Sequence, residues 1–152
     1  MNKPKITVSK YKHCHSGMEG DAFSCDMAVD GVLCASVSND GNGGPNFYQW
    51  KDNPKARDAR KLVNAYVASL PLDMRFGPPG IQPNLDCVLY NTMRDAQEQK
   101  RLARLCRTKT LFRLNGDPQG LWRYVNRPYD AAVKQHIMTR YGDKVEIANE
   151  GF

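Results

Sequence analysis

The sequence predicts an α+β protein in which a mainly antiparallel β-sheet, formed by an N-terminal meander plus later strands, packs with about three α-helices. Three observations predict this class. Short β-prone runs joined by turn residues fill the chain up to residue 50, two stretches with helical spacing follow over 54–107, and residues 109–147 return to strand, turn, helix and strand. The length of 152 residues is typical of one domain, so we expect a single domain over 1–152.

The N-terminal strands are predicted to form a meander. Residues 5–11 alternate like a first strand, 22–29 and 32–38 are β-prone runs, and 47–50 is an expected fourth strand. Asp30-Gly31 favours a type I′ hairpin turn, because that turn needs positive φ at both central residues. A two-residue turn gives the pairs Val29 with Val32, Met27 with Cys34 and Cys25 with Ser36, and the core face Phe23, Cys25, Met27, Val29, Val32 and Cys34.

Two helices are expected in the middle of the chain. Pro54 suits the first turn of one, and Asn84 is a good N-cap for a second that runs to about Arg107. The proline- and glycine-rich segment 71–83 is the loop between them. The expected buried residues are Ala59, Leu62, Val63, Tyr66, Val67 and Leu70 in the first helix, and Leu85, Val88, Leu89, Met93, Ala96, Ala103 and Cys106 in the second.

The C-terminal part is predicted to hold strands at 109–114 and 122–125, with a turn at 115–118, and a short terminal strand or tail at 144–147. A third helix is expected to start at Pro128 and to end at Gly142. Its expected apolar face includes His136, which we therefore expect to be partly buried. The other members of that face are Tyr129, Ala132, Val133, Ile137 and Tyr141.

Composition limits the function classes. The chain has 22 Lys+Arg against 16 Asp+Glu, a net charge of +6, which favours polyanionic partners and argues against an acidic DNA mimic. No run of eighteen apolar residues predicts a membrane span, and the first residues lack the apolar region of a secretory signal. We expect a cytoplasmic protein that does not associate with membranes. Its cysteines are expected to be reduced thiols: Cys14, Cys25, Cys34, Cys87 and Cys106.

The second predicted helix has a basic run that is a candidate binding surface. Arg94, Arg101 and Arg104 recur, with Gln97, at spacings of three and four residues, so they share one helix face. Arginine forks suit phosphate or carboxylate partners, although a solvated helix face explains the same pattern equally well. The predicted nucleic-acid or partner-binding residues are Arg94, Lys100, Arg101, Arg104, Arg107 and Lys109. Exposed aromatic rings at Tyr48, Trp50, Trp122 or Tyr124 would add stacking faces.

The glycine-rich stretch SVSNDGNGGPNFYQW, residues 36–50, favours a turn between two strands. It lacks the Lys-Ser/Thr pair and the following helix of a phosphate-binding loop, and the glycine and glutamate positions of a calcium loop. A backbone nest for an anion is the alternative. If the loop recognises a partner, the residues expected to do so are Asn39, Asp40, Asn42, Asn46, Tyr48 and Trp50.

No metal, cofactor or catalytic residue is predicted. His13-Cys14-His15 lacks the paired ligand spacing of zinc sites, and no nucleophile signature such as G-x-S-x-G occurs. The rival hypothesis is a small nucleotide- or nucleic-acid-processing enzyme. In that case the glycine-rich loop would hold phosphate and His13, His15 or His136 would carry protons.

Two stretches resemble small uncharacterised proteins of bacteriophages and prophages. They are VSNDGNGGPNFY, residues 37–48, and the end from LFRL through WR to RYGDKVEIANE, residues 111–150. In that group an Asn-Asp-Gly-x-Gly-Gly-x-Asn-x-Tyr run likewise precedes a helix. The resemblance implies a mobile-element origin and a bacterial host cell, and it supplies no catalytic residues.

The residues and this resemblance together lead to one functional hypothesis. The protein is expected to be a non-enzymatic binding protein that engages nucleic acid, or a host nucleoprotein defence complex such as a CRISPR effector, through its basic helix. It would then act as an anti-defence inhibitor of the anti-CRISPR type. The expected partners are a host protein or nucleoprotein complex, nucleic acid, or both, and a homodimer is a further possibility.

Overall fold

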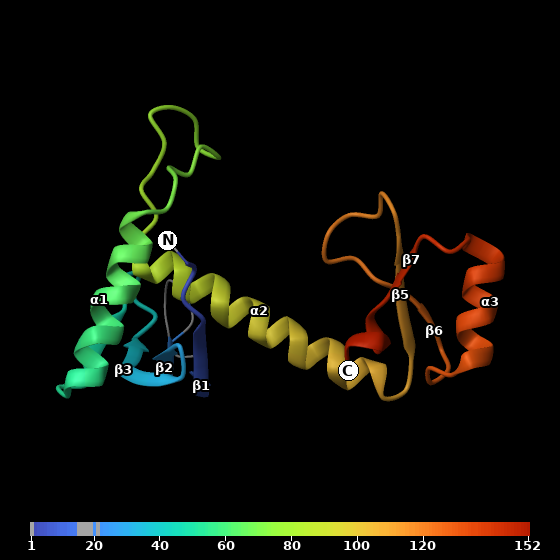
Figure 1. The fold of residues 1–152 in the computed structure, drawn as a ribbon, viewed down its shortest axis with the longest axis horizontal. Helices are drawn as coiled ribbons and strands as arrows, with labels where there is room; N and C mark the ends of the chain where they lie inside the picture. Colours follow the sequence, from blue (N-terminus) through green and yellow to red (C-terminus); the bar gives the residue numbers. More distant parts are fainter. Residues whose placement is uncertain (1, 15–19, 21) are drawn as a thin grey trace. The chain divides into compact units, whose positions relative to one another are not determined.

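The structure is a computed structural model that describes residues 2–14, 20 and 22–152. The chain forms two compact units, Met1–Asp95 and Ala96–Phe152, here called the N-terminal and the C-terminal unit (Figure 1). Both sheets are antiparallel and the described residues form three α-helices, so the predicted α+β class is confirmed. The expectation of a single domain concerns how the two units behave together, and it stays a prediction.

The N-terminal unit is built on a four-stranded meander. Its strands pair in the order β1-β2-β3-β4, and every pairing is antiparallel. Helix α1 and the first half of α2 follow the sheet. The bounds are β1 Ile6–Cys14, β2 Ala22–Val29, β3 Val32–Asn39, β4 Phe47–Trp50, α1 Pro54–Ala68 and α2 Leu85–Cys106.

The hairpin between β2 and β3 has the expected turn and a different register. Asp30 and Gly31 have φ angles of 49° and 80°, as a type I′ turn requires, and Val29 pairs with Val32. Beyond that pair the predicted register is wrong: Met27 pairs with Ala35 rather than Cys34, and Cys25 with Val37 rather than Ser36. A bulge gives β3 one residue more than β2 here, so Cys34 and Ala35 are both fully buried.

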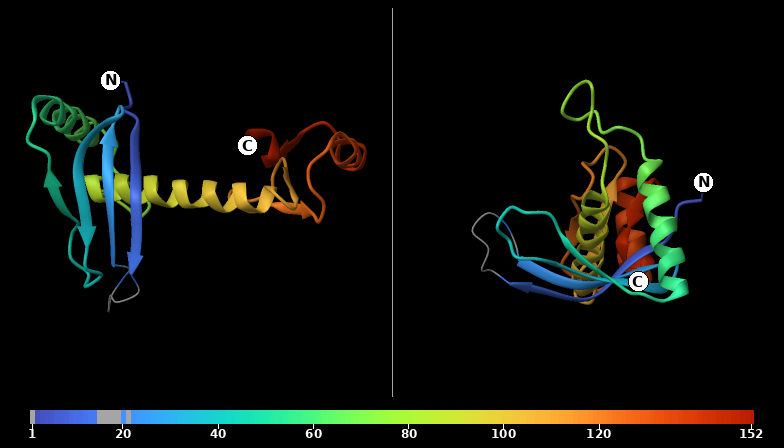
Figure 2. Two further views of the ribbon diagram at one scale, coloured as in Figure 1. Left: turned by 90° about the horizontal axis from the view of Figure 1, so that it is seen from below. Right: turned by 90° about the vertical axis from the view of Figure 1, so that its left-hand side faces the viewer.

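Both helices of the N-terminal unit cover the same face of its sheet (Figure 2). Asn53 caps α1 by accepting a hydrogen bond from the Ala56 amide, and Asn84 caps α2 by accepting one from the Cys87 amide. Leu62 is 39% exposed because it lies at the margin of the α1 stripe, against our expectation. The buried core comprises Cys25, Met27, Val29, Cys34, Ala35, Val37, Ala56, Ala59, Val63, Leu89 and Met93.

The C-terminal unit is a smaller α+β structure. Its three strands pair in the order β6-β5-β7, and α3 packs against them through a core of four buried residues, Phe112, Val133, Ile137 and Ile147. The second half of α2 also belongs to this unit and buries Leu102, which the sequence analysis missed. The bounds are β5 Thr110–Leu114, β6 Arg123–Val125, α3 Ala131–Tyr141, β7 Val145–Ile147 and a 3-10 helix, η1, Ala148–Gly151.

Two expectations for the third helix are wrong. The helix begins after Asp130, whose carboxylate accepts a hydrogen bond from the Val133 amide, and not at Pro128. His136 is exposed rather than partly buried, because only Val133 and Ile137, one turn apart, are buried by the sheet. Gly142, with φ of 88°, ends the helix as predicted.

Asn149 is a buried polar residue that joins three segments of the C-terminal unit. Its amide oxygen accepts a hydrogen bond from the Leu111 amide, and its amide nitrogen donates to the carbonyls of Cys106 and Lys109. The side chain is 8% exposed, so these bonds lie largely away from water. Asn149 therefore ties η1 to the end of α2 and the start of β5.

The cysteines whose side chains the structure describes are free thiols, at Cys25, Cys34, Cys87 and Cys106. The side chain of Cys14 lies outside the description. Burial, and secondarily the neighbouring Asp26 carboxylate, raises the pKa of the Cys25 thiol to about 11. Burial also raises the pKa of the Cys34 thiol. Both groups are therefore protonated and unreactive near neutral pH. Among the described residues, no helix combines the length and the apolar character needed to cross a membrane.

Candidate nucleic-acid interface

The net charge of the chain is concentrated in the C-terminal unit. Residues 96–152 contain 11 Lys and Arg against 6 Asp and Glu, an excess of five. Residues 1–95 contain 11 Lys and Arg against 10 Asp and Glu, an excess of one. The basic character that favours a polyanionic partner is therefore largely a property of 57 residues at the C-terminal end.

The residues of the predicted basic run differ in whether they pair with a carboxylate. Arg94 belongs to the N-terminal unit and lies 3.5 Å from the carboxylate of Asp95. Arg101 makes two short hydrogen bonds, of 2.8 and 2.7 Å, to the Glu98 carboxylate. This contact lowers the pKa of Glu98, so the carboxylate stays charged and neutralises Arg101. Arg94 and Arg101 are thus the weaker candidates in the run.

Three other members of the run form what we call the free basic stripe: Lys100, Arg104 and Arg107. All three are exposed, and none has an ion pair with any carboxylate in the described part of the chain. Their spacing of four and three residues places them on one side of the α2 end, while the buried Leu102 lies on the other. These side chains can donate hydrogen bonds to phosphate or carboxylate oxygens without first breaking an internal ion pair.

An aromatic ring lies close to the end of this stripe. Lys109, two residues after Arg107, holds its ammonium 4.5 Å from the ring centroid of Tyr124, and Tyr124 is 61% exposed. Tyr124 lies on β6 beside Leu111 of β5. The ammonium covers one face of this exposed ring, so the pair can hold a phosphate on Lys109 and a base stacked on the other face. Of the aromatic residues predicted as stacking faces, Tyr124 is the one with a largely exposed ring.

Two arginines of the C-terminal sheet have internal partners. Arg113 lies 4.9 Å from the ring centroid of Trp122 and also pairs with Glu146. Arg123 makes two hydrogen bonds of 2.9 Å to Asp117, which lower the pKa of Asp117 to about 2. These arginines hold the sheet and its turn together. The free basic stripe therefore differs from them in having no such role.

The glycine-rich loop satisfies its own hydrogen bonds. Asn39 accepts a hydrogen bond from the Gly41 amide and donates to the Gly44 carbonyl and to the Asn46 side chain. Asp40 accepts one from the Asn42 amide. Strand β4, not a helix, follows the loop, as the sequence predicted. These hydrogen bonds are typical of a turn. The side chains of Asn39 and Asn46 are already used in hydrogen bonds within the loop.

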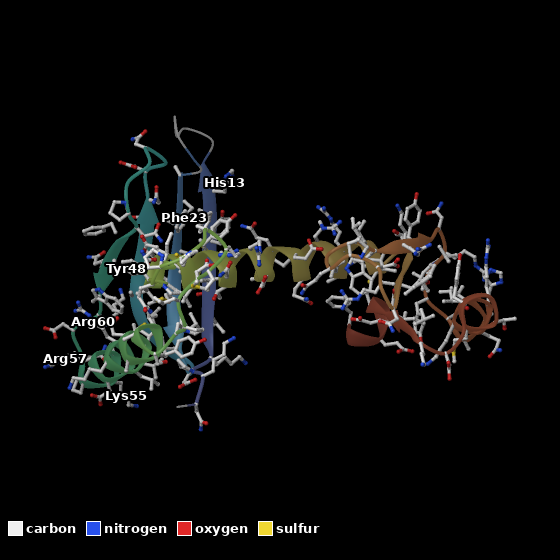
Figure 3. The ribbon with its side chains drawn as sticks, turned by 90° about the horizontal axis from the view of Figure 1, so that it is seen from above. His13, Phe23, Tyr48, Lys55, Arg57 and Arg60 are labelled. Carbon is white, nitrogen blue, oxygen red and sulfur yellow. The ribbon has the colours of Figure 1, made fainter. Side chains whose placement is uncertain are left out.

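Tyr48 and Trp50 are also held inside the N-terminal unit. The Tyr48 hydroxyl donates a 2.6 Å hydrogen bond to Asp86 in the first turn of α2, and the Asn46 amide donates to the other oxygen of that carboxylate. Burial, and secondarily the contact with Asp86, raises the pKa of Tyr48. Trp50 stacks on Tyr48, and the Arg60 guanidinium lies 4.5 Å from the Trp50 ring centroid. Figure 3 labels Tyr48 and Arg60. Neither ring is a free stacking face.

The described histidines of the rival enzyme hypothesis belong to different units. His13 lies on β1 in the N-terminal unit with its ring 6.5 Å from that of Tyr11, and His136 lies on α3 in the C-terminal unit. His15 lies outside the described residues. Over the part of the chain that the structure describes, no group of three or more His, Cys, Asp or Glu is arranged to hold a metal ion.

A large cavity in the N-terminal unit was not foreseen. It has a volume of about 930 Å³ and lies among the residues before β1, the end of α1, the 71–83 loop and the start of α2. The 71–83 loop, called the tongue below, is closed by backbone pairing between Asp73 and Ile81. Gly80 lies so close to Met74 that a Cβ added at Gly80 would be 2.6 Å from the Met74 sulfur. The signal in the sequence was the apolar content of this loop: Leu72, Met74, Phe76 and Ile81, all exposed.

Comparison with known proteins gives no relative. No family model, curated protein or solved structure matches the chain.

Proposed function

We propose that the protein is a non-enzymatic binding protein that engages nucleic acid through the basic surface of its C-terminal unit. The observation that carries the proposal is the free basic stripe, Lys100, Arg104 and Arg107, in a unit with 11 basic and 6 acidic residues. Structural cations in this unit lie against carboxylates or rings, as Arg113 and Arg123 do. Phosphate oxygens are the partners that a row of unpaired, exposed cations favours.

The neighbouring Tyr124 favours single-stranded nucleic acid over a duplex. Its ring is exposed beside Lys109, and unpaired bases can stack on such a ring, whereas bases within a duplex cannot reach it.

The cellular setting belongs to the same proposal and rests on the resemblance to small phage proteins. A phage-encoded protein of this charge would act against a host nucleoprotein complex of defence, such as a CRISPR effector. Occupation of a nucleic-acid channel or of the bound strand would inhibit that complex without any covalent step. A pull-down from bacterial lysate, with and without nuclease, tests this setting, because a nucleic-acid bridge is lost on nuclease treatment and a direct protein contact is kept.

Fluorescence anisotropy with labelled single-stranded DNA and RNA across a salt series tests the binding itself. The free basic stripe alone predicts that the logarithm of the association constant falls against the logarithm of salt concentration with a slope of about −2, from roughly 0.7 per phosphate for single strands. Absence of binding to either strand at low salt would overturn the proposal. Turnover of nucleic acid or nucleotides in the same samples, with and without divalent metal, would replace it by the enzyme hypothesis.

A further inference from the structure

The sheet of the N-terminal unit has a second face that no helix among the described residues of this unit covers. Helices α1 and α2 pack on the face that carries Met27 and Val37, and the other face is open in the view from below (Figure 2, left). Strand alternation gives the open face a largely polar surface of small hydroxyl side chains and lysines, with the apolar Ala28 and Leu33 beside the β2–β3 turn. The polar members and the exposed ring are Thr7, Ser9, Lys10 and Lys12 of β1, Ser24 and Asp26 of β2, Ser36 and Ser38 of β3, Phe47 and Gln49 of β4, and Lys51.

A bulge in β1 gathers lysines on this face. Ser9 pairs with Asp26 and Lys12 pairs with Ser24, so β1 has two residues opposite one residue of β2. In a regular strand Ser9 and Lys12 would point to opposite sides of the sheet, but the extra residue puts both on the open face. Lys10 lies in this bulge. Its φ of 50° is in the left-handed region that residues other than glycine rarely occupy.

The acidic charge on this face is already neutralised. Asp26 is the one carboxylate among its described residues, and it accepts a hydrogen bond from Ser36 and lies 3.2 Å from the Lys10 ammonium. The Ser36 bond, the Lys10 contact and the charge of Lys51 together lower the pKa of Asp26. Lys12 and Lys51 have no carboxylate partner in the described part of the chain. The open face therefore presents a net positive charge.

An exposed ring and a groove complete the surface. Phe47 lies on the edge strand β4 and is 67% exposed. It lines a groove of about 370 Å³ together with side chains of all four strands, including Lys10, Lys12, Ser24, Ser38 and Gln49. Serine and glutamine side chains can donate to phosphate, sugar or base-edge oxygens.

We propose that the open face of the N-terminal sheet is a second nucleic-acid-binding site, which takes a single strand with its phosphates on Lys12 and Lys51 and a base stacked on Phe47. Charge complementarity selects a polyanion. The exposed ring beside the hydroxyl groups selects an unpaired strand, because a base must be free of a partner strand to stack there. The site is separate from the free basic stripe and its existence does not depend on that stripe.

Lysine acetylation followed by mass spectrometry tests this site in the whole protein. A limiting dose of an acetylating reagent is applied with and without a saturating unlabelled oligonucleotide of mixed sequence, as DNA and as RNA. We expect Lys12 and Lys51 to lose several-fold in acetylation when the oligonucleotide binds, while Lys134, which pairs with Glu150, stays unchanged. Lys100 reports the stripe of the C-terminal unit in the same spectrum, so the two sites are read separately.

A ring variant distinguishes stacking from charge alone. With Lys100, Arg104 and Arg107 all changed to Gln, so that the C-terminal stripe is silent, Phe47→Ala should weaken the remaining binding by about 5- to 100-fold. Phe47→Tyr should keep it. Phe76→Ala removes another exposed phenyl ring of the same unit, on the loop rather than the sheet, and should have no effect.

Unchanged acetylation of Lys12 and Lys51 under conditions where the oligonucleotide binds would overturn the proposal, as would equal binding by Phe47→Ala and the parent. If no lysine is protected and the anisotropy assay detects no binding, both this site and the proposed function are overturned. Protection of Lys100 without protection of Lys12 and Lys51 would leave the proposed function standing and remove the sheet site.

Discussion

The two units of the chain differ in what holds them together and in what they leave exposed. The N-terminal unit buries eleven residues between a meander and two helix segments, and its charge is nearly balanced. The C-terminal unit buries four residues between α3 and its sheet, relies on Asn149 and on arginine–carboxylate pairs, and has five excess positive charges.

This difference separates cations that build the structure from cations that are available to a partner. In the C-terminal unit, Arg113 forms an ion pair with Glu146 and Arg123 forms one with Asp117. These pairs add to a small apolar core of four buried residues. Lys100, Arg104 and Arg107 are not used in this way within the described residues. The contacts within the described residues therefore do not account for the excess charge, which costs stability through self-repulsion.

The largest expected effect is on the small core. Ile137 is fully buried, so Ile137→Ala should lower the free energy of unfolding of the C-terminal unit by about 2–5 kcal/mol. Hydrogen exchange followed by mass spectrometry should show lost protection in β5, β7 and α3 and retained protection in β2 and β3. Equal loss in both units would show instead that the chain unfolds as one domain, as the sequence predicted.

Removal of the Asn149 side chain should have the next largest effect. Asn149→Ala leaves the buried Leu111 amide and two carbonyls without their partner, at a cost of about 1–3 kcal/mol in unfolding free energy. Chemical denaturation monitored by exchange at Leu111 measures it. The exposed Asn126→Ala is the matched control and should change stability by less than about 0.5 kcal/mol. A similar result for both variants would remove Asn149 from this account.

The helix caps provide a balanced pair of changes, one in each unit. Asn53→Ala removes the cap of α1 and Asp130→Ala removes the cap of α3, each at about 1 kcal/mol. Because the C-terminal unit has the smaller core, the same loss should produce more local opening there. Exchange rates of the first amides of α1 and α3 measure the two effects, and faster opening of α1 than of α3 would reverse the comparison.

The smallest expected effect concerns acidic pH. The Arg123 side chain holds the pKa of Asp117 near 2, below its usual 3.8, so the stability from this contact is fully present above pH 3.8 and is lost as the pH falls through 2. Asp117→Asn should remove that part of the pH dependence of the melting temperature between pH 5 and 2. Asp73→Asn, which removes a similar pair with Arg75 in the tongue of the other unit, is the control. Its melting profile for β5 and α3 should match the wild type.

Local signals made much of the fold predictable. Asp30-Gly31 predicted the hairpin turn, Asn84 the start of α2 and Gly142 the end of α3, because each acts through its own backbone or through amides three residues away. The two bulges could not be predicted, since register depends on how the whole sheet meets its helices. Asp130 was overlooked as a cap because Pro128 gave a competing start signal.

The candidate sites were predictable in composition but not in detail. The spacing of the basic run was visible, whereas the pairing of Arg101 with Glu98 and the freedom of Arg104 and Arg107 depend on side-chain positions. The open face of the N-terminal sheet depends on the β1 bulge, which turns Lys12 to the side of Ser9. No local pattern predicts it.

The central claim, that the unpaired cations of the C-terminal unit bind nucleic acid, is tested most directly by two matched triple variants. One changes Lys100, Arg104 and Arg107 to Gln, and the other changes Arg57, Arg60 and Lys61 on the exposed side of α1, which have internal partners, to Gln (Figure 3 shows Arg57 and Arg60). The account predicts that the first variant binds single strands more weakly, with the salt slope reduced by about 2, while the second binds like the wild type. Equal losses in both variants, or wild-type binding by the first, would contradict it.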